Sequence, residues 1–299
     1  MSRERTMNKK TTPQKKRKKI GIALGGGGAR GLAHLGVLRV LEKSNIPIDY
    51  IAGTSMGALV GGWYAIAKDV DFLEDIFSRV SSAQVEKMEE LLQGRKSSLF
   101  KEDDLVAMLE VGFGDRTIEK CQIPFAAIAT DAKNGGEVIL KKGSLREAVR
   151  ASTAIPAVFP AVEQQGKTLI DGGFTNPVPA DVVKDMGADI VIAVDVSSKW
   201  IDIKEYSIDA HDVYHILSDA FGVAEYQMAK RILGKYANVV IHPLVTEYGL
   251  FDFHKLSDIV QAGERATHYA LKDIEKQTGY KVTLQKGLAE QFVSMMFGE

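Results

Sequence analysis

The sequence predicts an α/β fold in which a mostly parallel central sheet is flanked by helices. Short apolar runs recur along the chain, and several are continuously apolar, as expected for strands covered on both faces. Helical patterns lie between them; apolar residues at positions 73, 76, 77 and 80, for example, follow the spacing of one helix face. Motifs typical of catalytic or ligand-binding sites follow three of these apolar runs. In parallel sheets, such sites collect at the carboxyl ends of the strands. The expected strands are residues 20–24, 50–52, 125–130, 137–140, 168–170, 190–196 and 239–241.

The first expected strand ends in a glycine-rich loop. Residues 25–31 read GGGGARG, and a helical pattern follows them. Glycines at the carboxyl end of a strand leave backbone N–H groups uncovered, and the start of a helix adds more of them. The loop therefore suits a negative charge, either on a phosphate or on the oxyanion that forms during acyl transfer.

Several interpretations of this loop compete. Gly26, Gly28 and Gly31 fit the G-x-G-x-x-G of a dinucleotide site, but the second strand lacks the acidic residue at its end that would hold a ribose. A Walker loop is excluded because no Gly-Lys-Ser/Thr closes the run. An oxyanion hole requires a nucleophile at a neighbouring strand end, and Ser55 occupies such a position. We favour the oxyanion hole over the dinucleotide site and over a purely structural turn.

The candidate nucleophile lies in the pentapeptide Gly53-Thr54-Ser55-Met56-Gly57, between the second expected strand and an apolar helical pattern. A serine at such a corner is held on a strained turn with its Oγ exposed, and flanking glycines let strand and helix approach closely. The new helix also points free N–H groups, including that of Met56, toward the hydroxyl. This placement predicts an activated nucleophile, although the five residues alone fit a tight turn equally well.

A third motif, Asp171-Gly172-Gly173, directly follows the expected strand 168–170. Asp followed by two glycines is commonly just a turn, because both residue types tolerate the backbone angles that turns require. With a nucleophile and an oxyanion loop already placed, the Asp171 carboxylate becomes the leading candidate for the general base. Four prolines between residues 151 and 180 bracket it, so we expect a rigid wall around this carboxylate.

In this order, the three motifs resemble those of the patatin-like phospholipases. Residues 31–38 (GLAHLGVL), 151–156 (ASTAIP) and 176–179 (NPVP) are similar to the bacterial branch of that family. The resemblance covers about residues 20–200. It implies a patatin-like, three-layer α/β/α fold that hydrolyses acyl esters of lipids without a metal or other cofactor.

The resemblance also implies a Ser-Asp dyad rather than a Ser-His-Asp triad. Ser55 would be the nucleophile and Asp171 the proton acceptor. The backbone N–H groups of Gly26, Gly27, Gly28 and Met56 would form the oxyanion hole, and Arg30, Gly31, Gly53, Gly57, Gly172 and Gly173 would support the site.

Two alternatives to this dyad stay open. A Ser-His-Asp triad could use His242, His254 or His268, which follow Asp171 in a suitable chain order. None of them lies in a recognisable loop motif, so surface or core histidines are the simpler interpretation, and His34 is expected to pack in the first helix. A non-catalytic lipid-binding or regulatory protein on the same fold is the alternative from another class.

Composition agrees with a single large core. The chain has 299 residues, of which 45% are hydrophobic, and Cys121 is its only cysteine. A reducing compartment is therefore natural, and Cys121 is interpreted as a small buried hydrophobe. No cysteine and histidine cluster has metal-ligand spacing, and no apolar run is long enough to span a bilayer. We expect a cytoplasmic protein with a lipid or ester substrate, with peripheral membrane contact as an option and no specific nucleic-acid partner.

The expected organisation has three parts. Residues 1–19 contain nine Lys or Arg and one acid, and we expect a disordered arm that binds anionic lipid, binds nucleic acid or is simply solvated. Residues 20–275 form the hydrolytic domain, and residues 276–299 are a C-terminal extension that docks on the fold or lies on a membrane. Within the domain, residues 68–118 are a helical insertion that borders the substrate groove or packs on the surface. Residues 157–159 line an acyl pocket or pack in the core.

Overall fold

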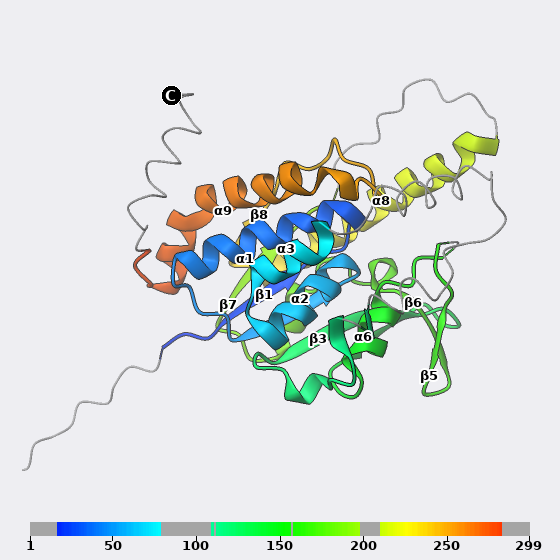
Figure 1. Cartoon of the computed structure of the whole chain (residues 1–299), viewed down its shortest axis with the longest axis horizontal. Coiled ribbons are helices and arrows are strands. Elements are labelled where there is room, and N and C mark those ends of the chain that lie inside the picture. The colour runs from blue at the N-terminus through cyan, green and yellow to red at the C-terminus, as the bar shows by residue number, and fades with distance from the viewer. Residues whose placement is uncertain (1–16, 79–108, 111, 157, 198–209, 283–299) are drawn as a thin grey trace, which may run out of the picture.

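The computed structural model describes residues 17–78, 109–110, 112–156, 158–197 and 210–282 (Figure 1). Its strands are β1 (Ile20–Leu24), β2 (Tyr50–Thr54), β3 (Phe125–Asp131), β4 (Gly136–Leu140), β5 (Val162–Gln164), β6 (Lys167–Asp171), β7 (Ile190–Val194) and β8 (Val239–Ile241). Its longer helices are α1 (Ala33–Lys43), α2 (Met56–Ala67), α3 (Val70–Ser78), α6 (Leu145–Ser152), α7 (Ala180–Asp185), α8 (Ala210–Tyr236) and α9 (Leu256–Thr278).

The strands form one eight-stranded sheet in the order β5-β6-β3-β2-β1-β7-β8, with β4 paired to β3 off this path. Strands β3, β2, β1, β7 and β8 run parallel, which confirms the mostly parallel sheet. The other three strands pair antiparallel to their neighbours. Of these, β5 is short and was not among the expected strands; it forms a hairpin with β6 around Gln165 and Gly166, which both have positive φ.

Strand β3 brings the ends of two other strands together. One edge of β3 pairs with β4 from Ala127 to Asp131. Because a strand has only two edges, β2 and β6 share the other one: Thr54 of β2 lies opposite Ile128, and Asp171 of β6 lies opposite the next residue, Ala129. The two strands run in opposite directions, so their carboxyl ends meet head-on along β3. This meeting point places the site.

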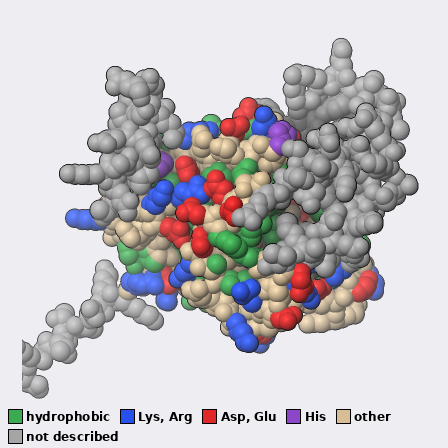
Figure 2. All heavy atoms as spheres, in the orientation of Figure 1, with side chains coloured by type: hydrophobic (Ala, Val, Ile, Leu, Met, Phe, Trp, Pro, Cys, Tyr) green, Lys and Arg blue, Asp and Glu red, His purple; other side chains and the backbone are tan. Residues whose placement is uncertain are grey.

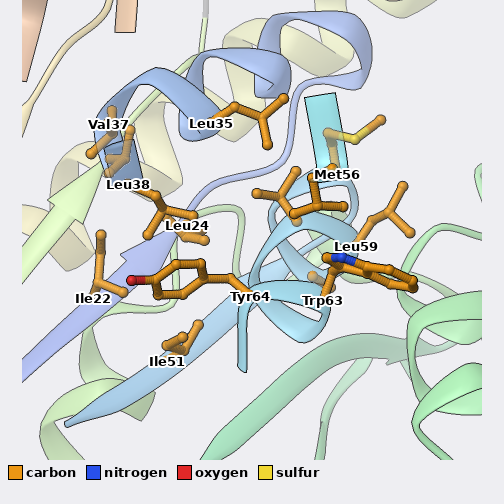
Figure 3. Packing of buried hydrophobic residues seen from close by; sticks show 14 of the residues in the cluster. Ile22, Leu24, Leu35, Val37, Leu38, Ile51, Met56, Leu59, Trp63 and Tyr64 are labelled. Atoms are coloured by element: carbon orange, nitrogen blue, oxygen red, sulfur yellow. The ribbon is translucent and has the colours of Figure 1, made fainter. Parts of the chain in front are cut away.

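Helices cover both faces of the sheet, which confirms the three-layer fold. Figure 1 shows α1, α2, α3 and α9 on one face. On the other face, Ala229 and Leu233 of α8 pack in one core cluster with α7. Along β1 the side chains alternate: Ile22 and Leu24 belong to the core under α1 and α2, and Ala23 belongs to the core under α7 and α8. Figure 3 shows Ile22 and Leu24 packed with Leu38 of α1 and Tyr64 of α2.

The outer surface on the α1 and α9 side carries acids and bases that are intermixed rather than separated (Figure 2). Arg39 of α1 pairs there with Asp71 and Glu74 of α3 and with Glu264 of α9. These pairs tie three helices of one layer together. Asp71 is exposed and its pair contributes little, whereas Arg39, Glu74 and Glu264 are partly buried.

Several expected segments lie outside the described residues. These are the predicted arm as far as residue 16, residues 79–108 of the predicted insertion, residue 157 of the predicted acyl pocket, and the extension from residue 283. The described end of the arm begins with Arg17, which forms an ion pair with Asp49. Helix α9 continues to Thr278, beyond the expected domain boundary at 275. Within the described ranges, no helix is both long and apolar enough to cross a membrane.

Candidate active site

Ser55 occupies the corner between β2 and α2. It has φ 53° and ψ −124°, a conformation that a residue with a side chain rarely adopts, and α2 begins at the next residue. The corner is closed by glycines: a Cβ on Gly57 would lie 2.1 Å from the carbonyl oxygen of Leu24, and a Cβ on Gly53 would lie 2.3 Å from that of Gly57. Only glycine permits this approach of strand and helix, as the sequence predicts.

Two hydrogen bonds from other segments of the chain hold the turn between β2 and α2. The Ser55 backbone N–H donates to the hydroxyl of Ser152, at the end of α6, over 3.0 Å. The Thr54 hydroxyl donates to the carbonyl of Asn176 over 2.7 Å. Ser152 and Thr54 are fully buried, so both bonds form away from water. Sequence reasoning missed Ser152, although it lies within the 151–156 stretch that carries part of the family resemblance.

The glycine loop leaves β1 beside Ser55. The Gly26 N–H donates to the carbonyl of Pro177 over 2.9 Å, so the prediction that Gly26 supplies an oxyanion donor does not fit this bond. In the described part of the chain, no hydrogen bond takes up the N–H of Gly27, Gly28 or Met56. Position 28 requires a glycine, because its φ is 54° and a Cβ there would lie 2.4 Å from the Leu250 carbonyl oxygen. Three predicted donors therefore stay available.

Three buried residues support this loop. The Arg30 guanidinium donates to the carbonyl of Gly27 over 3.4 Å. The His34 Nε2–H donates to the carbonyl of Gly25 over 2.8 Å, and burial lowers the pKa of His34 to about 4. An uncharged imidazole thus packs in the first helix, as expected. Gly31 gives room to the Met56 side chain, which a Cβ would meet at 2.5 Å.

Asp171 ends β6 against the Ser55 corner. Its N–H donates to the carbonyl of Ala154 over 3.0 Å, and its Oδ1 accepts the N–H of Gly173 over 2.8 Å. Burial raises the pKa of Asp171 to about 6, against the opposing effects of the Ser55 hydroxyl and the Gly173 N–H. The other carboxyl oxygen, Oδ2, is buried and accepts no short hydrogen bond from the described residues. This oxygen is therefore open to a proton.

The three rival histidines lie elsewhere. His242 is about half exposed and contacts Asp195, with its Nδ1 3.4 Å from the Asp195 Oδ2. His254 is exposed in a short 3-10 turn before α9, and His268 lies within α9 beside Glu264. The charges that act on His268 are those of Glu264 on α9 and Lys43 on α1. The geometry brings together the serine and the aspartate without a histidine between them.

Where the chain is described, no group of three or more His, Cys, Asp or Glu residues is placed to hold a metal ion. Cys121 packs against the core at the far end of α2, and burial raises the pKa of its thiol to about 11. Cys121 is partly buried, so it packs as a small hydrophobe but, contrary to the expectation from the sequence, is not fully buried.

Comparison with known proteins supports the motif-based resemblance. The family model described as patatin-like phospholipase matches residues 22–184. The patatin-like phospholipase domain-containing protein ZK370.4 of Caenorhabditis elegans is 30% identical over 273 residues, which are 82% of this chain and 20% of that protein. Lysophospholipase NTE1 of Saccharomyces cerevisiae is 31% identical over 278 residues, 82% of this chain and 16% of that protein.

A mammalian relative also matches part of the chain. Patatin-like phospholipase domain-containing protein 6 of Mus musculus is 34% identical over 184 residues, 60% of this chain and 14% of that protein. The chain thus spans a fifth or less of these three relatives. The structure of VipD from Legionella pneumophila aligns over 86% of this chain and 67% of its own, with a TM-score of 0.46 and 12% identity. These worm, yeast and mouse relatives do not bear out the expected likeness to the bacterial branch.

Proposed function

Since the chain belongs to the patatin-like phospholipase family, we propose that it is a serine acyl-ester hydrolase of lipid esters, with Ser55 as nucleophile and Asp171 as its base. One observation carries this proposal. The carboxyl ends of β2 and β6 meet along β3, so that Thr54 and Asp171 lie opposite neighbouring residues of that strand. A hydroxyl and a carboxyl that are far apart in sequence therefore share one buried corner.

In the first step, the Ser55 Oγ attacks the ester carbonyl carbon and its proton passes to Oδ2 of Asp171. The carbonyl π electrons move onto oxygen. When this tetrahedral intermediate collapses, the bond to the leaving alcohol breaks and the alcohol takes the proton from Asp171. Water repeats the sequence on the acyl-enzyme and releases the fatty acid, which returns Ser55 and Asp171 to their starting states.

The developing oxyanion is met by the N–H groups of Gly27, Gly28 and Met56. Each donor of this kind contributes roughly 10²–10³ in rate in enzymes that use such a hole. The Gly26 N–H instead joins the loop to the carbonyl of Pro177. The Arg30 side chain stabilises the loop by its hydrogen bond to the carbonyl of Gly27. The Asp171 pKa of about 6 makes this carboxylate a better base than an exposed one, while it is still ionised at neutral pH.

A lipid ester is the substrate class that the family suggests. One relative is named a lysophospholipase and others carry patatin-like phospholipase domains, but these names describe proteins several times longer than this chain. We therefore propose the ester class and leave the choice between phospholipid, lysophospholipid and simpler ester to experiment. Every one of these presents the same acyl carbonyl to Ser55.

The test compares wild type with Ser55→Ala on p-nitrophenyl esters of graded chain length and then on defined phospholipids. We expect turnover by wild type, a loss of at least 10³-fold in the variant (roughly the contribution of an activated nucleophile), and matching melting temperatures. A fluorophosphonate probe should label Ser55 in wild type. A folded wild-type protein that neither turns over esters nor reacts with the probe would favour a non-catalytic lipid-binding protein on this fold.

A further inference from the structure

A second carboxyl group faces Asp171 from the other side of the Asp171-Gly172-Gly173 turn. It belongs to Glu225 of α8. A Cβ on Gly173 would lie 2.2 Å from the Glu225 Oε1 and 3.2 Å from the Asp171 Oδ1. The two carboxyl groups are therefore separated by no more than the space that one methyl group would fill. The bare Cα of Gly173 lets Glu225 come this close.

An aromatic contact holds α8 in this position. Phe221, one helical turn before Glu225, packs on Phe174 with ring centroids 4.1 Å apart. Phe174 ends the same short turn that begins at Gly172. The helix is therefore fixed to the turn at Phe174 and meets it again at Gly173 through Glu225.

The charges around Glu225 are mostly negative. Asp171 faces it from the end of β6, Asp195 from the end of β7, and Arg30 from the glycine loop. The residue keeps some exposed surface, but burial of its carboxyl group and then the charge of Asp171 raise the pKa of Glu225 to about 8, with Arg30 acting in the opposite direction. At neutral pH the acid keeps its proton. Asp171, with the lower pKa of about 6, carries the charge.

We propose that Glu225 is a positioning residue for the Ser55–Asp171 pair: its protonated carboxyl group fills the space over Gly173 and limits the two facing carboxyl groups to one negative charge, which lies on Asp171. This inference rests on the function proposed above and adds a residue to it. Two carboxyl groups at such short range resist ionising together, so their protons leave in two separate steps. The first step produces the base that Ser55 needs. The second places another negative charge beside it.

The test uses Glu225→Gln, which keeps the shape of the side chain without its proton equilibrium. In the pH profile of kcat/KM on a p-nitrophenyl ester, we expect wild type to show an ionisation near pH 6 and a further one near pH 8. The variant should keep the first and lose the second. Glu247→Gln, which changes an exposed acid in the loop after β8, is the control and should follow wild type.

Thermal unfolding gives a readout that needs no activity. Because the pKa of Glu225 is raised from its ordinary 4.5 to about 8, the folded protein binds this proton more tightly than the unfolded chain does. Wild type should therefore lose melting temperature relative to Glu225→Gln as the pH rises from about 4.5 to about 8. A constant difference over that range, together with unchanged inflections in the pH profile, would overturn the inference.

The two proposals fail in different ways. If ester turnover disappears in Ser55→Ala but Glu225→Gln follows wild type in both readouts, the hydrolase stands and the role of Glu225 falls. If no variant and no wild type turns over esters, yet the melting temperatures diverge with pH as described, Glu225 is the buried acid inferred here and the hydrolase assignment falls.

Discussion

Asp171 is a carboxyl group whose surroundings change its ordinary chemistry. It lies in the sheet with only 4% of its surface exposed, accepts one backbone N–H at Oδ1, and has a buried Oδ2 with no hydrogen-bond partner among the described residues. An unperturbed aspartate is a weak base, and removal from water strengthens it. At the residue scale, catalysis by a dyad therefore depends on how deeply one carboxyl group is buried.

The first prediction concerns pH. The pKa of Asp171 is raised from 3.8 to about 6, and only the ionised form can accept the Ser55 proton. Below about pH 6, kcat/KM should therefore fall about tenfold per pH unit, and it should level off above. A stopped assay on a p-nitrophenyl ester across pH 4.5–7.5, an interval chosen to bracket that pKa, measures this. An activity that holds constant down to about pH 4 would contradict the raised pKa.

The same shift predicts a stability effect. Since the folded protein holds the Asp171 proton more tightly than the unfolded chain, the wild type loses stability as the pH rises from about 3.8 to about 6. Asp171→Asn removes that loss, so its melting temperature should exceed that of wild type above pH 6 and approach it near pH 4. Equal pH dependence of the two melting curves would show that folding does not raise the pKa of Asp171.

Helix α6 contacts the turn at Ser55 through the hydroxyl group of Ser152. Ser152, at its last residue, accepts the Ser55 N–H and is fully buried. Ser152→Ala leaves that N–H without a partner, which should cost about 1–2 kcal/mol of stability and roughly tenfold in kcat. Ser44→Ala is a matched control, because the Ser44 hydroxyl is also buried but bonds to no described residue. Comparable losses in both variants, by thermal unfolding and ester turnover, would remove the special role of Ser152.

The approach of α2 to β1 gives a second prediction at this scale. A Cβ on Gly57 would lie 2.1 Å from the Leu24 carbonyl oxygen, and neither backbone can yield without opening the corner. Gly57→Ala should therefore lower stability by about 3 kcal/mol or more and abolish ester turnover. Gly234→Ala, in α8 with open space around the added methyl group, should instead be neutral or stabilising by up to about 1 kcal/mol. Differential scanning fluorimetry of the pair distinguishes these outcomes.

Strands and turns could be predicted from the sequence where the pattern that specifies them lies within the segment itself. The strand candidates at 20–24 and 239–241 have the observed bounds, and the corner at Ser55 follows from its flanking glycines. The direction of β6 is not a local property, because it depends on pairing with β3. Glu225 could not be found either, since a single acid in a long helix carries no pattern that points to Gly173. The same holds for Ser152, whose role depends on where α6 ends.

At the scale of the whole molecule, the sheet brings the functional segments together. The glycine loop, Ser55 and Asp171 follow β1, β2 and β6, and the register along β3 brings the last two together. The histidines that could have formed a triad are held elsewhere by other contacts, such as that between His242 and Asp195. The organisation beyond this domain, including membrane contact and compartment, stays a prediction from the sequence.

This arrangement predicts that no histidine is needed. His242→Ala, His254→Ala and His268→Ala should each keep ester turnover within about threefold of wild type, the scale of a modest change in packing. Their initial rates on one p-nitrophenyl ester, measured with circular dichroism to confirm folding, decide the matter. A folded histidine variant that loses all turnover would replace the dyad by a triad.

The most direct test of the Ser55–Asp171 pair is the rate at which a fluorophosphonate labels Ser55 in wild type and in Asp171→Asn, followed by intact mass and peptide mapping at pH 7.5, a value chosen above the Asp171 pKa. The asparagine keeps the shape of the carboxyl group but cannot accept a proton. We predict labelling at Ser55 in wild type and a rate lower by about 10²–10⁴-fold in the folded variant. Equal labelling rates in the two proteins would contradict the assignment of Asp171 as the base.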